Sequence, residues 1–208
     1  MKIPISSVKM CKGSRGHPME NLRTAISSLG EYDTDFEKAV RAGNKNLALK
    51  LISQVATIVS AIYRVRKNKK IIFPKKEYGF AENFLFMFRG KIADSEEIDA
   101  LDRYLILHAD HGLNASTFAA RVTASTLSDI YSAVISAVGT LRGRLHGGAG
   151  ERVMNMLLDV NNPAEVEAYI QGMLSDGKKI MGFGHRIYMK EDPRSRHLRK
   201  ISKSLCER

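Results

Sequence analysis

The feature that most constrains the fold is a helical spacing of apolar residues, which recurs along almost the whole chain. It is clearest over residues 46–64, where apolar side chains follow one another at intervals of three and four. This stripe consists of Leu47, Leu51, Val55, Ile58, Val59 and Ile62. A stripe of this kind predicts an amphipathic helix with one face buried in a core.

Residues that begin and end helices divide the rest of the chain into further helical segments. Pro18 suits the first turn of a helix, and Gly30 suits its end. Asp94, Asn114 and Asp129 are residues of the type that caps helix N-termini. The predicted helices cover residues 18–30, 46–64, 82–88, 95–106, 115–126, 130–142, 151–158, 163–175 and 193–206.

Alternating strand patterns are nearly absent from the sequence. The short candidates are residues 70–73 and the stretch that follows Lys179. We therefore predict an all-α fold of many medium-length helices joined by short turns. Glycine-rich breaks at 143–150 and 182–184 are the places where the backbone can bend or approach a ligand closely.

The composition excludes several classes of protein. With 208 residues, 44% hydrophobic and 26% charged, the chain can form its own core and is neither disordered nor a disulfide scaffold. The two cysteines form no CxxC pair, which excludes a zinc ribbon and a thioredoxin-type site. The longest apolar stretch, 51–63, is interrupted by polar residues, and the first residues do not form a signal peptide. We expect a cytoplasmic protein that does not span a membrane.

The net charge of +11 predicts attraction to anions. Much of the excess lies in residues 64–76, where every charged residue is Lys or Arg. A solvated basic face is one explanation, and binding of a nucleic acid, of a membrane surface or of a phosphorylated small molecule is another. Because no helix-turn-helix or zinc pattern accompanies the charge, we do not expect a nucleic-acid partner.

Three of the histidines lie in unusual surroundings. His146 is in RLHGGAG, His185 is in GFGHRIY, and His111 is in HADHGLNAST, next to a predicted helix N-terminus. Histidine suits acid–base work near neutral pH, and Arg194, which follows an Asp-Pro pair, offers a fork for a carboxylate. Structural roles for the histidines, or a metal site at His108 and His111, are alternatives, but no Cys or HExxH pattern completes a metal set. The residues predict a histidine-based site for an anion without naming a reaction.

Three segments together resemble the citrate synthase family: residues 105–150, residues 182–194 (GFGHRIYMKEDPR) and residues 17–30 (HPMENLRTAISSLG). The resemblance covers nearly the whole chain. It implies an all-α homodimer that condenses acetyl-CoA with oxaloacetate to give citrate and CoA, a step of the tricarboxylic acid cycle. It also implies a large-domain portion at 1–147 and a truncated small-domain portion at 148–208.

The same resemblance implies roles for individual residues. His146 and His185 are the implied catalytic residues: His146 stabilises the enol form of the thioester, and His185 polarises the ketone of oxaloacetate. His111 and Arg194 bind the oxo-acid. The CoA contacts fall on Lys179, Ile180 and Gly182, and the resemblance implies acetyl-CoA as a substrate with no cofactor and no metal.

The sequence departs from the family pattern at several positions. Gly112, Arg144 and Gly150 stand where the family usually has Glu, Pro and Asn. The family's catalytic Asp belongs to a further C-terminal part, and no residue here is assigned to it, so we expect impaired activity. Alternatives are a non-catalytic or regulatory relative that forms dimers, a 2-methylcitrate synthase, a citryl-CoA lyase module and a basic nucleic-acid-binding protein.

Overall fold

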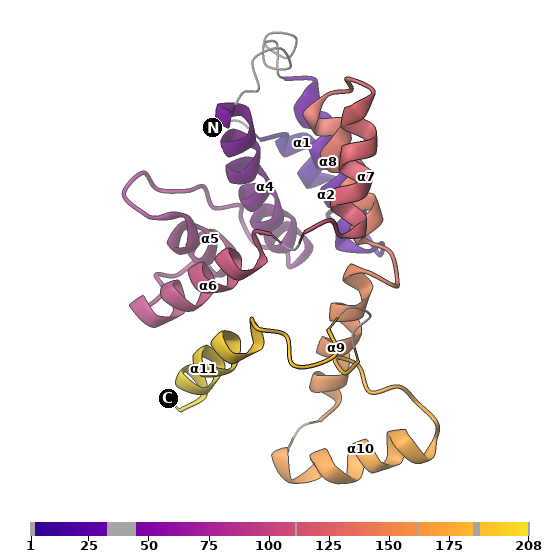
Figure 1. Ribbon diagram of the computed structural model, residues 1–208. Helices are drawn as coiled ribbons and strands as arrows, with labels where there is room; N and C mark the ends of the chain where they lie inside the picture. The colour runs from indigo at the N-terminus through magenta and orange to yellow at the C-terminus, as the bar shows by residue number, and fades with distance from the viewer. Residues whose placement is uncertain (1–2, 33–44, 111, 161, 185–187, 208) are drawn as a thin grey trace.

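The computed structural model describes residues 3–32, 45–110, 112–160, 162–184 and 188–207, and within these ranges every regular element is helical (Figure 1). The all-α prediction is confirmed. The elements are α1 (Ile5–Lys9), α2 (Pro18–Gly30), α4 (Lys45–Arg66), α5 (Phe80–Arg89), α6 (Ser95–His108), α7 (Ala115–Ser125), α8 (Ile130–Leu141), α9 (Gly147–Asp159), the 3₁₀ turn η1 (Pro163–Glu165), α10 (Val166–Ser175) and α11 (Ser195–Cys206).

The hydrophobic core is built around α4, as the apolar stripe predicts. Ile58 of α4 and Ile26 of α2 are fully buried, and Tyr131 of α8 is nearly so. Val8 of the short helix α1 closes the same cluster. Figure 1 shows α1, α2 and α8 gathered beside α4, with α7 outside α8. Helices whose apolar faces meet in this way remove those faces from water, which is the main source of stability.

Helix α4 is longer than the apolar stretch on which the membrane prediction was based. Its 22 residues are long and apolar enough to cross a membrane by length and composition alone. The prediction that this stretch is too short and too polar to span a membrane is therefore wrong. The position of α4 gives a different explanation of its composition, because its apolar residues pack against α1 and α2 in the core.

The three N-caps predicted from the sequence are confirmed by their hydrogen bonds. The carboxylate of Asp94 accepts from the amide of Glu97 at 2.9 Å, and the side-chain oxygen of Asn114 accepts from the amide of Thr117 at 2.9 Å. Asp129 accepts from the amide of Ser132 at 2.8 Å. Each cap satisfies an amide that has no partner inside the helix, which is why these helices begin where the sequence predicts.

Some predicted boundaries are wrong. Helix α9 begins at Gly147 rather than residue 151, because its first residues pack against the end of α8 despite their low helix propensity. Helix α11 begins at Ser195, two residues late, and the segment 163–175 is divided into η1 and α10. Neither strand candidate forms a strand in the described residues. Ile71 instead packs against the core.

One member of the basic cluster at 64–76 has a structural role. Arg64 is buried, and its Nε donates to the carbonyl oxygen of Lys70 while Nη1 donates to that of Phe88 at 3.3 Å. Phe88 lies in the last turn of α5, where the negative end of the helix dipole favours a cation. Arg64 thus ties the end of α4 to the end of α5.

The last helices form a C-terminal arm, which we define as α9, η1, α10 and α11. Figure 1 shows α9 leading away from the core helices and α10 lying at its far end. Within α9 the buried residue is Gly148, whereas the apolar side chains of Met154, Leu157 and Leu158 are exposed. Helix α11, the last helix of the arm, packs against α6.

Candidate functional site

His146 occupies the N-cap position of α9, at the junction between the core and the arm. Its amide donates to the carbonyl oxygen of Gly143 at 3.0 Å, and the amide of Gly148 donates to the same oxygen at 3.2 Å. This turn fixes the backbone on both sides of His146. The half-buried imidazole is therefore presented from a defined corner rather than from a free loop.

The glycines that follow His146 are required by a close approach of α9 to α8. A Cβ at Gly147 would lie 2.4 Å from the carbonyl oxygen of Leu141, far inside van der Waals contact. A Cβ at Gly148 would lie 3.2 Å from the carbonyl oxygen of Gly143. The group approached at 143–150 is the end of α8, and the predicted approach of this backbone to a ligand stays a prediction.

The imidazole of His146 is hydrogen-bonded to the first turn of α7. Its Nε2 lies 2.9 Å from the hydroxyl oxygen of Ser116. That hydroxyl is also 2.7 Å from the side-chain oxygen of Asn114, the N-cap of α7. A chain of three polar side chains therefore joins the start of α7 to the start of α9.

The contact with Asn114 sets the direction of this chain, because an amide oxygen only accepts and the single hydroxyl proton of Ser116 is therefore donated to Asn114. Nε2 of His146 must then donate to Ser116, and Nδ1 of the neutral ring is an acceptor. If the hydroxyl turns from Asn114 to Nε2, Nδ1 carries the proton of the neutral ring and can donate to a ligand. Ser116 thus decides whether His146 presents a donor or an acceptor at Nδ1.

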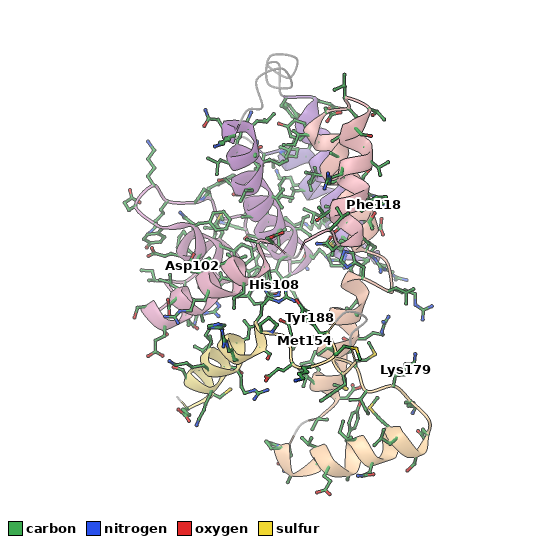
Figure 2. The ribbon with its side chains drawn as sticks, in the orientation of Figure 1. Asp102, His108, Phe118, Met154, Lys179 and Tyr188 are labelled. Atoms are coloured by element: carbon green, nitrogen blue, oxygen red, sulfur yellow. The ribbon has the colours of Figure 1, made fainter. Side chains whose placement is uncertain are left out.

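The predicted CoA-binding residues lie where the chain returns from α10 to α9. Lys179 is exposed and Ile180 is half-buried. Gly182 has φ of +90°, and a Cβ there would be 3.5 Å from a methyl group of Val153 in α9. The glycine permits a left-handed backbone conformation in contact with the helix that His146 begins. Figure 2 shows Lys179 on the outer side of this segment.

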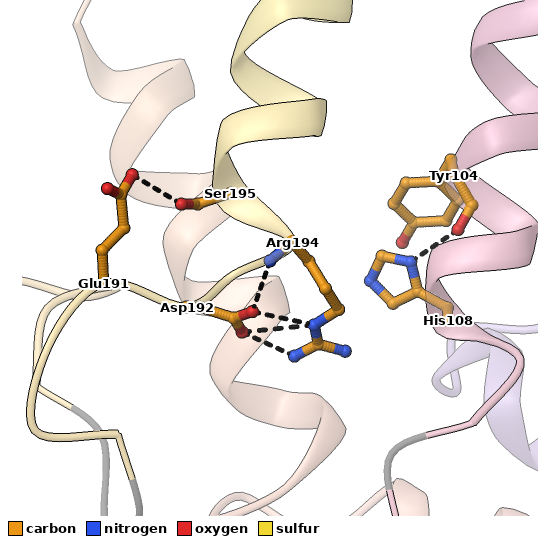
Figure 3. A network of polar contacts seen from close by, with 6 residues as sticks. All are labelled: Tyr104, His108, Glu191, Asp192, Arg194 and Ser195. Carbon is orange, nitrogen blue, oxygen red and sulfur yellow. Dashed lines mark hydrogen bonds and ion pairs between the residues drawn. The ribbon is translucent and has the colours of Figure 1, made fainter.

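Arg194 precedes α11 and is held by its neighbour Asp192. Its Nε lies 3.0 Å from Oδ1 and its Nη2 lies 2.7 Å from Oδ2 of the carboxylate, and its own amide donates to Oδ1 at 2.9 Å (Figure 3). These hydrogen bonds raise the pKa of the Arg194 guanidinium above its usual value. The Nε edge of the fork is therefore occupied, and the end formed by Nη1 and Nη2 is the edge left for a second carboxylate.

Helix α6 supplies the group that faces this region. Figure 3 shows Tyr104 and His108 across from Arg194, with the two rings stacked. Their centroids are 4.1 Å apart, and Nδ1 of His108 lies 2.7 Å from the carbonyl oxygen of Tyr104. Because Tyr104 lies four residues earlier on the same helix, this contact fixes the imidazole of His108 against α6.

The structure tests the predicted constellation only in part. His111 and His185 lie outside the described residues, so their convergence with His146 stays a prediction. Within the described residues, no hydrogen bond joins His146 to Arg194; each is held by its own partner. Arg144, which follows the turn at Gly143, is exposed.

No group of three or more His, Cys, Asp or Glu side chains that could hold a metal ion occurs among the residues that the structure describes. Both cysteines are free; Cys11 is buried in the core and Cys206 is exposed. Burial raises the pKa of the Cys11 thiol, which favours the unreactive protonated form.

Sequence reasoning missed the groups that hold the proposed site residues. Ser116 lies thirty residues before His146, and no local pattern links a helix-starting serine to a distant histidine. Asp192 stands two residues before Arg194, and its role as an internal partner for the guanidinium could have been inferred from this spacing. Residues fixed by tertiary contacts give weaker signals in a single sequence than caps and glycines.

The comparisons with known proteins agree with the fold and with these motifs. The family model "Citrate synthase, C-terminal domain" matches residues 3–208. Citrate synthase 2 of Bacillus subtilis (strain 168) is 48% identical over 189 residues, which is 91% of this chain and 51% of that protein. The citrate/2-methylcitrate synthase of the same organism is 42% identical over 193 residues, 92% of this chain and 52% of that protein.

Among solved structures, the chain is similar to the citrate synthase of the archaeon Thermoplasma acidophilum, in a ternary complex with carboxymethyl coenzyme A and oxaloacetate. The TM-score is 0.86 at 33% identity, and the match covers 99% of this chain and 55% of that one. The chain thus spans about half the length of the curated relatives it matches. Since the family match extends over almost every residue, the chain belongs to the citrate synthase family.

Proposed function

We propose that this chain carries the substrate-polarising part of a citrate synthase-type acyltransferase, which condenses acetyl-CoA with oxaloacetate to give citrate and CoA. The observation that carries the proposal is the placement of His146 between two helix N-termini, with a serine hydroxyl that controls its protons. The Thermoplasma acidophilum protein, whose fold is similar, is described in complex with a CoA derivative and oxaloacetate.

The reaction explains what such a histidine is for. The methyl group of an acetyl thioester is a weak carbon acid, and removing its proton places negative charge on the thioester oxygen. A hydrogen-bond donor aimed at that oxygen stabilises the enol or enolate that forms. In our proposal Nδ1 of neutral His146 is this donor, which requires the Ser116 hydroxyl to turn from its acceptor Asn114 and to donate to Nε2 when the thioester binds. The new carbon–carbon bond then forms at the ketone of oxaloacetate, and hydrolysis of the citryl thioester releases CoA.

Arg194 is the proposed ligand for one carboxylate of oxaloacetate. Asp192 holds the Nε edge of its guanidinium, so the substrate carboxylate takes the Nη1 and Nη2 edge. The sequence resemblance gives His111 the binding of the oxo-acid and gives His185 the polarisation of its ketone. We propose the same roles for them here.

The proposed CoA contacts are Lys179, Ile180 and the backbone at Gly182. A glycine at φ of +90° leaves main-chain polar groups uncovered by a side chain, which suits recognition of an adenine ring by backbone hydrogen bonds. An exposed lysine at 179 suits an anionic ligand. We keep residues 1–147 and 148–208 as the proposed large-domain and small-domain portions, since α9 begins at this boundary.

The carboxylate that removes the methyl proton is not assigned to any residue of this sequence. By resemblance, it belongs to a further C-terminal part of the family. We therefore propose that the 208-residue chain binds oxaloacetate but condenses it with acetyl-CoA slowly when no other chain supplies a base.

We propose a homodimer, with α7 as the contact surface. Phe118 and Val122 lie four residues apart on α7 and are 57% and 52% exposed, while the other side of α7 packs against α8 (Figure 2). An exposed apolar pair on one helix face suits contact with a second copy, because the pair is then removed from water. Sedimentation of the wild type and of Phe118→Lys tests this: a wild-type dimer that becomes monomeric supports the surface, and a monomeric wild type contradicts it.

A 2-methylcitrate synthase is the second candidate, favoured by the similarity to a Bacillus subtilis protein named for both products. A cytoplasmic location and a place in the tricarboxylic acid cycle remain part of the proposal.

The test measures binding and turnover separately. Isothermal titration of oxaloacetate into the 208-residue chain should show binding that His185→Ala abolishes. Thiol release with acetyl-CoA or propionyl-CoA should then be slow with either thioester, and their ratio gives the acyl preference. Absence of oxaloacetate binding would contradict the proposed function, and rapid turnover would contradict the unassigned base.

A further inference from the structure

The segment HPMENLRTAISSLG, residues 17–30, has no part in the proposed chemistry, although its first residue reaches the helix that His146 begins. His17 is the N-cap of α2, and its Nδ1 accepts a hydrogen bond from the amide of Met19 at 3.2 Å. Because Nδ1 is an acceptor, the proton of the neutral ring lies on Nε2. His17 therefore presents a donor on the side away from α2.

That donor faces α9. Nε2 of His17 lies 3.3 Å from Oε2 of Glu151, which is in the second turn of α9, five residues after His146. The contact exists in either charge state of the imidazole, since Nε2 carries a proton in the neutral ring and in the cation. It joins two helices that are far apart in the sequence.

The turn at Gly143 and the close approach to α8 hold the first residues of α9, and the contact with His17 lies one turn further along the helix. The helix points away from the core, and its apolar face is exposed (Figures 1 and 2). His17 and Glu151 line a cleft of about 400 Å³ together with Leu141, Arg142 and Gly147, at the meeting point of α2, α8 and α9. Next to it, Nε of Arg142 lies 3.8 Å from a carboxylate oxygen of Glu20 in α2.

We propose that His17 is a positioning residue for His146: by holding Glu151, it fixes the first turns of α9 and keeps the imidazole of His146 on Ser116. The contact between Nε2 and the serine oxygen is 2.9 Å, and a hydrogen bond is lost when the two atoms separate by a further ångström. The catalytic meaning of this positioning rests on the proposed function. The effect of His17 on the hydrogen bond between His146 and Ser116 does not depend on that function.

The two nitrogens of His17 can be tested separately. In His17→Asn the amide oxygen replaces Nδ1 as the cap acceptor for Met19, but no donor reaches Glu151. In His17→Gln the longer side chain places an amide donor near the former Nε2. Glu151→Ala removes the acceptor, and Glu151→Gln keeps an acceptor oxygen without charge. Asn155→Ala, one turn further along α9, is the matched control.

The readout is the imidazole of His146 itself, observed by nitrogen NMR of the 208-residue chain, with amide hydrogen exchange of the first turns of α9. We expect His17→Asn and Glu151→Ala to shift the Nε2 signal of His146 and to raise α9 exchange about two- to fivefold, the size expected for a partly exposed ion pair. Glu151→Gln, His17→Gln and Asn155→Ala should stay close to the wild type. The double variant His17→Asn, Glu151→Ala should equal either single variant.

Two results would overturn the proposal. One is an unchanged His146 signal in both His17→Asn and Glu151→Ala. The other is an equal change in His17→Asn and His17→Gln with no change in Glu151→Ala, which would assign the effect to the cap of α2. Neither measurement uses turnover, so a failure to bind oxaloacetate would contradict the proposed function without affecting this result.

Discussion

The core and the C-terminal arm are built from the same kind of amphipathic helix but differ in what covers the apolar faces. In the core, Ile26 and Ile58 are fully buried between α2, α4 and α8. In the arm, Met154 and Leu157 of α9 are more than half exposed. His146 lies at the boundary between the two. The comparison teaches that the proposed site combines groups on a well-buried framework with groups on helices whose apolar faces are exposed, and poorly covered helices open more easily than a packed core.

The largest expected effect tests whether the two regions differ in stability. Ile58→Ala should lower the free energy of unfolding by about 2–5 kcal/mol, because it leaves a cavity in a fully buried site. Leu157→Ala should change it by less than about 0.5 kcal/mol, since that side chain is mostly in water. Urea denaturation followed by circular dichroism measures both. Equal losses would mean that the arm is packed as tightly as the core.

The second effect concerns Arg194, which directly precedes helix α11 of the arm. Arg194→Lys keeps the positive charge but loses the planar fork, so oxaloacetate should bind roughly 30-fold more weakly, or about 2 kcal/mol. Arg196→Lys, an exposed neighbour in α11, is the control and should leave the affinity unchanged. Isothermal titration calorimetry gives both constants. Equal weakening in the two variants would indicate general charge attraction instead of a specific contact.

The sequence predicted the core better than the arm, for physical reasons. Periodicity located α4, and the caps Asp94, Asn114 and Asp129 were identified because each signal lies within one helical turn. The start of α9 was misplaced, because a run of glycines indicates a break unless the neighbouring α8 is known. The motif predicts Arg194 as a site residue, which stays a prediction, whereas no motif points to Ser116, since its partner is defined only by tertiary structure.

A smaller effect is expected where the core region meets the arm, at Ser116. Ser116→Ala removes the partner of Nε2, so the neutral ring of His146 should populate both tautomers, a change of about 1 kcal/mol in their balance. Ser116→Thr keeps a hydroxyl and should preserve the wild-type tautomer. Nitrogen chemical shifts of His146 report the populations. An identical spectrum in Ser116→Ala would show that this hydrogen bond does not control the ring.

The smallest effect lies entirely within the core region, at the cap of α8. Burial raises the pKa of Asp129, but hydrogen bonds from the hydroxyl and amide of Ser132 outweigh it, and the net pKa lies below the usual 3.8. The folded state therefore gains stability from this carboxylate above that value and loses it as the pH falls through the lower folded-state pKa.

Asp129→Ala should cost about 1 kcal/mol at pH 7, and Asp129→Asn, which keeps the cap, should cost less and lack this acid dependence. Urea denaturation between pH 7 and pH 2.5 measures the free energy of unfolding of each variant and its dependence on pH. A wild type and an Asp129→Asn variant with parallel pH profiles would show that the cap carboxylate contributes nothing through its charge.

The central claim is that oxaloacetate binds between a stable core and an arm that becomes ordered when it binds. Amide hydrogen exchange of the 208-residue chain, with and without oxaloacetate, tests this claim most directly. We predict that amides of α2, α4 and α8 exchange slowly in both states, while those of α9 and the start of α11 exchange quickly alone and slow down when oxaloacetate binds. Saturating oxaloacetate that leaves α9 and α11 unprotected, or that protects only core helices, would contradict the account.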